Sequence, residues 1–198
     1  LLFVGETQGA KQKVSGLRHN YNLKILYTIF LTRCTCYDKL NYGDIMVKIM
    51  FVCHGNICRS PMAEFIFKDL VSKKGLAERF YVSSCATSTE EIWNGVGNPV
   101  YPPAKRELAK HNISCEGKRA VQLKKSDYAA FDYLVAMDTN NVRNIMRIIG
   151  SDKDDKVRKL MSYTNRGGDV SDPWYSGDFE TCYNDIYEGC CGLLEKLI

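Results

Sequence analysis

The feature that most constrains how this chain can fold is the segment CHGNICRS at residues 53–60. Residues 47–52 before it, all apolar except Lys48, predict a short buried strand, and residues 61–70 after it predict a helix with proline in its first turn. Gly55 and Asn56 suit a loop with unusual backbone angles. A strand that turns tightly into a helix N-terminus makes an anion site, because backbone N–H groups and the helix dipole favour negative charge there.

The two ends of this loop carry the residues that such a site needs for chemistry. Cys53 stands at the start, where the positive field favours a thiolate, the nucleophilic form of cysteine. Arg59 stands near the end and offers a planar fork that matches phosphate oxygens. Cysteine and arginine at this spacing also occur by chance, so the flanking strand and helix carry the interpretation. Together they predict covalent phosphoryl transfer through cysteine.

A second motif, DPWY, stands at residues 172–175. The leaving oxygen of a phosphate ester needs a proton as its bond to phosphorus breaks, and Asp172 can supply one from a loop. Trp174 and Tyr175 can form the wall of a cleft for a flat aryl group. The alternative for this motif alone is a surface turn with packed aromatic residues.

With these motifs, the chain from about Met46 to the C-terminus resembles the low-molecular-weight protein tyrosine phosphatases. The resemblance rests on CHGNICRSPMAE at residues 53–64 and on DPWY at residues 172–175. It implies a three-layer α/β fold with a central parallel four-stranded sheet flanked by helices. It also implies hydrolysis of phosphotyrosine, on proteins or in small aryl phosphates, through a phosphocysteine intermediate and without metal or cofactor.

The resemblance assigns roles to individual residues. Cys53 would be the nucleophile, Arg59 the phosphate clamp and Asp172 the general acid and base. Ser60 would donate a hydrogen bond to the sulfur of Cys53, and Cys58 would form a reversible disulfide with it. The phosphate would be bound by residues of the loop: His54, Gly55, Asn56, Ile57, Cys58 and Arg59. Four polar residues would support the loop: Asn56, Ser60, Ser84 and His111.

Simpler interpretations exist for the secondary residues. His111 could be a polar residue that ends a helix, and Ser84 an ordinary residue at the end of a strand. Asp138, part of a Met-Asp pair that recurs in the family, could only cap a helix. Cys58 could be a small packed residue without a redox role.

The chain departs from the family pattern near the expected substrate cleft. Glu90 stands where many relatives carry an aromatic residue that stacks on the substrate ring. The following residues 91–99 form an insertion, in which Trp93 could replace the missing wall or cover an apolar cluster of the insertion itself. His54 replaces a residue that is often hydrophobic and could simply face solvent. These departures affect substrate preference and leave the predicted chemistry intact.

Apolar strands alternate with helices along the rest of the chain, which predicts a parallel sheet with crossover connections. Further strands are expected at residues 80–83, 131–136 and 156–162, and helices at 103–110, 140–149 and 178–197. The carboxyl ends of the strands would bring the Cys53 loop, Ser84 and Asp138 together. We expect residues 46–198 to form the catalytic domain. Residues 1–45 are expected to be a non-native or poorly ordered extension, since the chain begins with leucine and family members usually start near Met46. The alternative is a native appendage that packs on the domain or marks a partner site.

Composition excludes several other classes of protein. The net charge of +4 comes without a basic stripe interleaved with aromatic residues, so no nucleic-acid partner is expected. No run of eighteen apolar residues exists, so no membrane span is expected. The nine cysteines show no paired CxxC spacing, which argues against a zinc site. A catalytic thiol favours the reducing cytoplasm, and we expect a monomer, with a weak dimer as the alternative.

Three rival functions remain. A thioredoxin-coupled arsenate reductase shares the fold, but it needs resolving cysteines in a segment near residues 120–140, which holds none. A protein arginine phosphatase of the same fold tends to have threonine before the second loop cysteine, where Ile57 stands here, and lacks aromatic residues such as Trp174 and Tyr175. The third rival is a phosphate-binding or redox-sensing module without turnover, which would not need Asp172.

Overall fold

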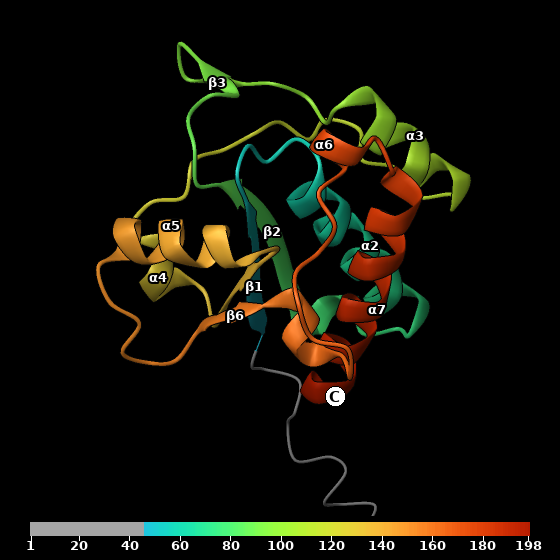
Figure 1. Ribbon diagram of the computed structural model, residues 1–198. Coiled ribbons are helices and arrows are strands. Elements are labelled where there is room, and N and C mark those ends of the chain that lie inside the picture. Colours follow the sequence, from blue (N-terminus) through green and yellow to red (C-terminus); the bar gives the residue numbers. More distant parts are fainter. Residues whose placement is uncertain (1–45) are drawn as a thin grey trace, which may run out of the picture. The chain divides into compact units, whose positions relative to one another are not determined.

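A parallel four-stranded sheet with strand order β2-β1-β5-β6 forms the centre of the computed structural model, which describes residues 46–198 (Figure 1). The strands are β1 Val47–Cys53, β2 Phe80–Ala86, β5 Tyr133–Ala136 and β6 Val157–Lys159. Each neighbouring pair is parallel, so the expected α/β fold is confirmed. The prediction for residues 1–45 lies outside the described part of the chain.

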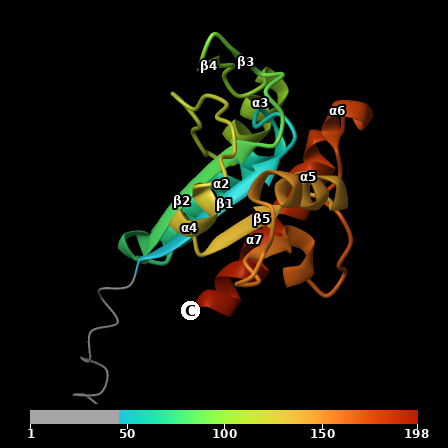
Figure 2. The same ribbon diagram turned by 90° about the vertical axis from the view of Figure 1, so that its left-hand side faces the viewer.

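Helices cover both faces of this sheet, which makes three layers. One face carries α2 (Arg59–Lys73), α3 (Pro102–Lys110) and α7 (Phe179–Leu197); the other carries α4 (Asp127–Ala130) and α5 (Thr139–Ile149). Figure 2 looks onto the side of α4 and α5. Within residues 46–198, no helix is both long and apolar enough to cross a membrane.

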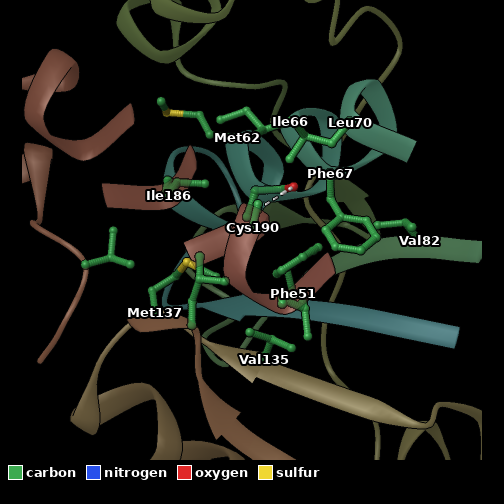
Figure 3. Packing of buried hydrophobic residues seen from close by; sticks show 14 of the residues in the cluster. Phe51, Met62, Ile66, Phe67, Leu70, Val82, Val135, Met137, Ile186 and Cys190 are labelled. Carbon is green, nitrogen blue, oxygen red and sulfur yellow. Dashed lines mark hydrogen bonds between the residues drawn. The ribbon is translucent and has the colours of Figure 1, made fainter. Parts of the chain in front are cut away.

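From Ile49 to Cys53, strand β1 is buried on both faces, which explains why this part of its sequence is entirely apolar. Ile49 and Phe51 pack into the cluster beneath α2 and α7, while Met50 and Val52 pack into the cluster beneath α5. Side chains of a strand point alternately to opposite faces, so each cluster receives every second residue. Phe51 is fully buried and lies in the first cluster (Figure 3). Burying a side chain of this kind stabilises the fold by about 1.5–3 kcal/mol.

The fourth strand is shorter than the sequence suggested. It ends at Lys159, and the chain continues in a 3-10 turn, η2 (Leu160–Tyr163). Leu160 and Met161 are both fully buried and lie in the same cluster, the one beneath α2 and α7, whereas two successive residues of a strand would point to opposite faces. Instead, the turn packs beneath α7, where a Cβ on Gly189 would lie only 2.5 Å from Cγ of Leu160.

The insertion forms a small antiparallel hairpin of β3 (Ile92–Trp93) and β4 (Val96–Gly97), which the sequence analysis did not predict. Asn94 and Gly95 connect the strands with φ angles of 50° and 79°. Positive φ at both positions is typical of the tight hairpin turns that favour an Asn-Gly pair. The Asn-Gly signal was therefore present in the sequence.

The order of the strands decides where a ligand can enter. After β1 the chain crosses to β2 on one side, whereas β5 is added on the other side of β1. The loops at the carboxyl ends of β1 and β5 therefore separate and leave a crevice, as at the ligand sites of open α/β sheets. The hairpin and the short helix α6 (Pro173–Ser176) lie at this same end (Figures 1 and 2).

Candidate active site

Residues 53–60 form a tight loop from the end of β1 into α2, as the sequence predicted. Asn56 has a φ of 58°, a left-handed conformation that asparagine tolerates better than most residues. The backbone N–H groups of Gly55, Ile57 and Cys58 donate to no acceptor within residues 46–198. Free amides at a helix N-terminus are suited to binding an anion.

The sulfur of Cys53 lies at the base of this loop and is nearly buried. Its Sγ is 3.0 Å from Oγ of Ser60 and accepts a hydrogen bond from the backbone N–H of Asn56 at 3.3 Å. Ser60 Oγ is also 3.4 Å from the carbonyl oxygen of Cys85. Two groups on the protein can therefore stabilise negative charge on the sulfur.

Asn56 holds the loop in shape through three hydrogen bonds. Its Nδ2 group donates to Oγ of Ser60 at 2.9 Å and to Oγ of Ser84 at 2.8 Å. Its Oδ1 accepts from the backbone N–H of Val121 at 3.0 Å. The structure thus brings together three of the four residues expected to support the loop.

The network continues to Glu64, a residue to which the sequence analysis assigned no role. Ser84 donates to Oε2 of this buried carboxylate at 2.6 Å, Lys118 lies 3.0 Å from the same oxygen, and Lys68 lies 2.5 Å from Oε1. Burial alone would raise the pKa of Glu64, but Lys118, Lys68 and Ser84 outweigh it and lower the pKa. Glu64 is therefore a charged anchor behind the loop.

His111 is not part of this network, so the sequence prediction for this residue is wrong. It follows the last residue of α3, where its ring stacks on Tyr183 with 3.7 Å between the ring centroids. Its Nε2 lies 3.8 Å from Oε1 of Glu107, one helical turn earlier. The simpler interpretation, a polar residue that ends a helix, describes His111 correctly.

Arg59 is fixed between two carboxylates from distant parts of the chain. Its Nη1 is 2.6 Å from Oδ2 of Asp138, and its Nη2 is 2.7 Å from Oδ2 of Asp172. Burial opposes the charge of Arg59, but Cys53, Asp172 and Asp138 outweigh it and raise the pKa. Asp138 also caps α5 by accepting from the backbone N–H of Asn141 at 2.6 Å. Asp138 therefore caps the helix as the alternative stated, but it is more than a cap, because the same side chain also orients the guanidinium.

The loop that carries Asp172 makes hydrogen bonds to the segment after β5 and to α7. Val170 donates a backbone hydrogen bond to the carbonyl of Met137 at 2.9 Å, next to the end of β5. Ser171 donates from its backbone N–H and its hydroxyl to Oδ2 of Asp185 on α7, at 3.0 and 2.6 Å. Asp172 itself caps α6 through the backbone N–H of Trp174 at 3.1 Å. No signal in the sequence indicated the role of Asp185, because only the fold brings its partners beside it.

Asp185 has a further partner on the same loop. Its Oδ1 lies 2.8 Å from Nη2 of Arg166, which also pairs with Glu188. Burial would raise the pKa of Asp185, but the hydrogen bonds from Ser171 and Arg166 outweigh it and lower the pKa. The carboxylate is thus charged and keeps the segment before Asp172 in place.

A cleft of about 310 Å³ lies between the Cys53 loop and the DPWY motif. Its lining contains the expected residues of the loop and of the DPWY motif: Cys53, His54, Gly55, Ile57, Cys58, Arg59, Asp172, Trp174 and Tyr175. Asn56 lies behind the loop. Burial, followed by the charges of Cys53 and Asp172, raises the pKa of the Cys58 thiol to about 12.

Trp93 does not line this cleft, so the structure does not support its expected role as a replacement wall. It lies on β3 opposite Val96, and 71% of its surface is exposed. Glu90 and Glu91, which precede the hairpin, line the cleft on this side instead. Within residues 46–198, no group of three or more His, Cys, Asp or Glu side chains is arranged to hold a metal ion.

A nearly buried thiol, a guanidinium and a carboxylate at the carboxyl end of a parallel sheet define a cysteine-dependent phosphatase. Residues 48–198 match the family model described as low molecular weight phosphotyrosine protein phosphatase. The chain belongs to this family.

Individual relatives agree with this membership. YfkJ of Bacillus subtilis, a low molecular weight protein-tyrosine-phosphatase, is 37% identical over 154 residues, covering 77% of this chain and 96% of the relative. Its crystal structure superposes with a TM-score of 0.72, covering 77% of this chain and 94% of YfkJ. A low molecular weight phosphotyrosine protein phosphatase of Schizosaccharomyces pombe is 41% identical over 156 residues, covering 76% and 97%.

One solved structure of the same fold is that of the YwlE arginine phosphatase, a mutant with a phosphorylated active-site serine. It is 27% identical, has a TM-score of 0.66, and covers 76% of this chain and 95% of YwlE.

Proposed function

We propose that this protein hydrolyses phosphotyrosine and aryl phosphate monoesters through a phosphocysteine formed on Cys53. The observation that carries the proposal is the convergence of Cys53, Arg59 and Asp172 at one cleft, although the third lies far from the others in the sequence. A purely phosphate-binding site would need the loop and the arginine only. The carboxylate adds the group that a leaving phenolate requires.

In the first step, the thiolate of Cys53 attacks phosphorus in line with the ester bond. A sulfur–phosphorus bond forms, the bond between phosphorus and the aryl oxygen breaks, and Asp172 gives its proton to that oxygen. Arg59 and the free N–H groups of the loop hold the other phosphate oxygens, so positioning and electrostatics provide most of the rate. As the phosphate takes over Arg59, the ion pair between Arg59 and Asp172 opens. Asp172, which takes up a proton from solvent once it is released from the guanidinium, then acts as the acid.

In the second step, Asp172 takes a proton from water while the water oxygen attacks phosphorus. The sulfur–phosphorus bond breaks, inorganic phosphate is released and the thiolate of Cys53 returns. The hydroxyl of Ser60, 3.0 Å from the sulfur, stabilises the thiolate as it leaves. The exposed aromatic side chains of Trp174 and Tyr175 form the wall for the aryl ring.

The experiment that tests the proposal is release of p-nitrophenol from p-nitrophenyl phosphate, with reductant and a chelator present. Wild type should turn over, Cys53→Ser should not, and Cys191→Ser, which changes a thiol of α7 outside the cleft, should serve as the matched control. Peptides carrying phosphotyrosine or phosphoarginine then define the substrate, and phosphotyrosine should be preferred. Full activity of Cys53→Ser would overturn the mechanism, and preference for phosphoarginine would overturn the substrate.

We further propose that the protein acts as a monomer in the reducing cytoplasm, without a nucleic-acid or membrane partner. The free state of every cysteine within residues 46–198 supports a reducing environment. In this setting the loop thiols are also candidates for reversible oxidation, with Cys58 as the second thiol beside Cys53. Size-exclusion chromatography with light scattering tests the monomer, and a dimer at micromolar concentration would contradict it.

A further inference from the structure

Carboxylates outnumber cations around the cleft in which we place the phosphate dianion. The acidic and basic side chains that line it are four carboxyl groups, one guanidinium and one imidazole: Glu90, Glu91, Asp138, Asp172, Arg59 and His54. Arg59 is already paired with both aspartates. The two glutamates therefore add negative charge that the guanidinium of Arg59 does not balance.

The two glutamates differ in how accessible their carboxylates are to a substrate. Glu91 is held against the loop, since its Oε2 accepts from Nδ2 of Asn98 at 2.7 Å and its Cγ would lie 3.0 Å from a Cβ on Gly55. Glu90 stands at the mouth, and 72% of its side chain is exposed. The only partner of its carboxylate within the described residues is His54, with 2.9 Å between Nε2 and Oε2. Glu90 is thus the carboxylate that an incoming chain can contact.

A dianion that enters a cleft with surplus negative charge is repelled, and the repulsion is strong where water is partly excluded. A substrate that carries its own cation beside the phosphate relieves this cost, because the cation pairs with the surplus carboxylate. Glu90 occupies the position at which the family resemblance leads one to expect an aromatic wall, and Trp93 does not line the cleft. On this side, the cleft therefore presents the negative charge of Glu90 to a substrate in place of an aromatic side chain.

We infer that Glu90 selects phosphotyrosyl chains in which lysine or arginine stands next to the phosphotyrosine. The inference rests on the proposed phosphotyrosine phosphatase function and adds a substrate class to it. Charge pairs at the rim of an interface act mainly through the association rate and specificity. The preference is therefore expected in kcat/KM, and it should weaken with salt, which screens exposed charges.

The test compares three phosphotyrosyl peptides that differ only in the flanking residues, which are lysine, alanine or glutamate. Wild type, Glu90→Gln and the control Glu78→Gln are assayed with each peptide. Glu78 is exposed on the turn η1 (Ala77–Arg79), which precedes β2 and so lies at the amino end of that strand, away from the cleft. Both variants remove one negative charge, so a global charge effect would be equal in the two.

In wild type and Glu78→Gln, we expect the lysine peptide to exceed the glutamate peptide in kcat/KM by about fivefold at low salt. In Glu90→Gln the ratio should fall to about twofold or less, and at about 0.5 M salt all three enzymes should show a ratio near one. Because each ratio is taken within one enzyme, lower folding or turnover of a variant cancels. A ratio near one in wild type, or an unchanged ratio in Glu90→Gln, overturns the inference, whereas absence of turnover on every phosphotyrosyl peptide overturns the proposed function.

Discussion

Arg59 and Asp172 form an ion pair across the cleft, with 2.7 Å between Nη2 and Oδ2. These are the two residues that the proposed mechanism uses separately, one to hold the phosphate and the other to move a proton. The carboxylate therefore competes with the phosphate for the guanidinium until the substrate binds. The pair keeps Asp172 within reach of the reacting atoms and at the same time opposes binding of the anion.

Replacing Asp172 by asparagine should separate these two effects. We expect kcat on phosphotyrosyl peptides to fall by about two to four orders of magnitude, the usual contribution of a general acid and base. Inorganic phosphate should inhibit more strongly, because the competing negative charge beside Arg59 is lost. Steady-state kinetics with phosphate as inhibitor measures both. Unchanged kcat would remove Asp172 from the mechanism, and weaker inhibition would contradict the competition.

Asp185 should position Asp172 without touching the substrate. Asp185→Ala removes both hydrogen bonds from Ser171, so we expect about a tenfold loss in kcat/KM for substrates with poor leaving groups, since small displacements of catalytic groups are costly. The loss should be smaller for p-nitrophenyl phosphate, whose leaving group needs the proton less. Glu188→Ala is the control, because Glu188 shares Arg166 with Asp185 but makes no hydrogen bond to Ser171. An equal loss on all leaving groups would indicate a structural role only.

Glu64 should stabilise the fold in a pH-dependent manner. Glu64→Gln leaves Lys118 nearly buried without its charged partner, and we expect the free energy of unfolding at pH 7 to fall by about 2–3 kcal/mol. The pKa of Glu64 in the folded protein lies below its ordinary value of 4.5. Its contribution is therefore complete above pH 4.5 and is lost as the pH falls through the lower folded value.

Urea unfolding of both proteins at several pH values measures this effect. The difference between wild type and Glu64→Gln should be constant from neutral pH down to about 4.5 and should shrink below it. Asp69→Asn is the control, because Asp69 pairs with the exposed Lys73 one turn along α2 and should change stability by less than about 1 kcal/mol. A difference that stays constant into strong acid would show that Glu64 acts through packing and not through charge.

Peroxide should inactivate the enzyme reversibly if Cys58 protects Cys53. Peroxide converts the Cys53 thiolate to a sulfenic acid, and attack by Cys58 on that sulfur forms a disulfide and releases water. In Cys58→Ser the sulfenic acid should oxidise further, so activity should not return after reductant. Since the pKa of Cys58 is about 12, disulfide formation should speed up as the pH rises toward 8. Equal recovery of wild type and Cys58→Ser, with Cys191→Ser as the control, would rule out this role.

The loop of residues 53–60 was predictable because its determinants are local. A buried strand, residues that tolerate positive φ and a helix start stand next to one another in the sequence, and the structure joins them as expected. Ser84 and Asp138 could be placed because each lies near the carboxyl end of a strand of the same sheet. By contrast, Glu64 and Asp185 were missed, since each acquires its role from a partner that is distant in the sequence.

His111 and Trp93 show the opposite error, in which a family position or an insertion suggested a role that the fold does not provide. His111 stacks on Tyr183 of α7, and Trp93 lies on an exposed hairpin away from the cleft. Both placements depend on how α3 and the hairpin pack on the domain. Neither depends on the local sequence.

The sequence by itself determined the alternation of strands and helices and the tight loop between the first strand and its helix, because hydrophobic periodicity and backbone preferences act over a few residues. Its two motifs also supplied the three side chains that we propose to react. Only the tertiary structure decided that Asp138 and Asp172 share Arg59, that Glu64 and Asp185 anchor the two loops, and that Glu90 faces the cleft. These relationships arise where segments far apart in the chain meet at one end of the sheet, and the strand order that brings them there is set by the packing of the whole domain.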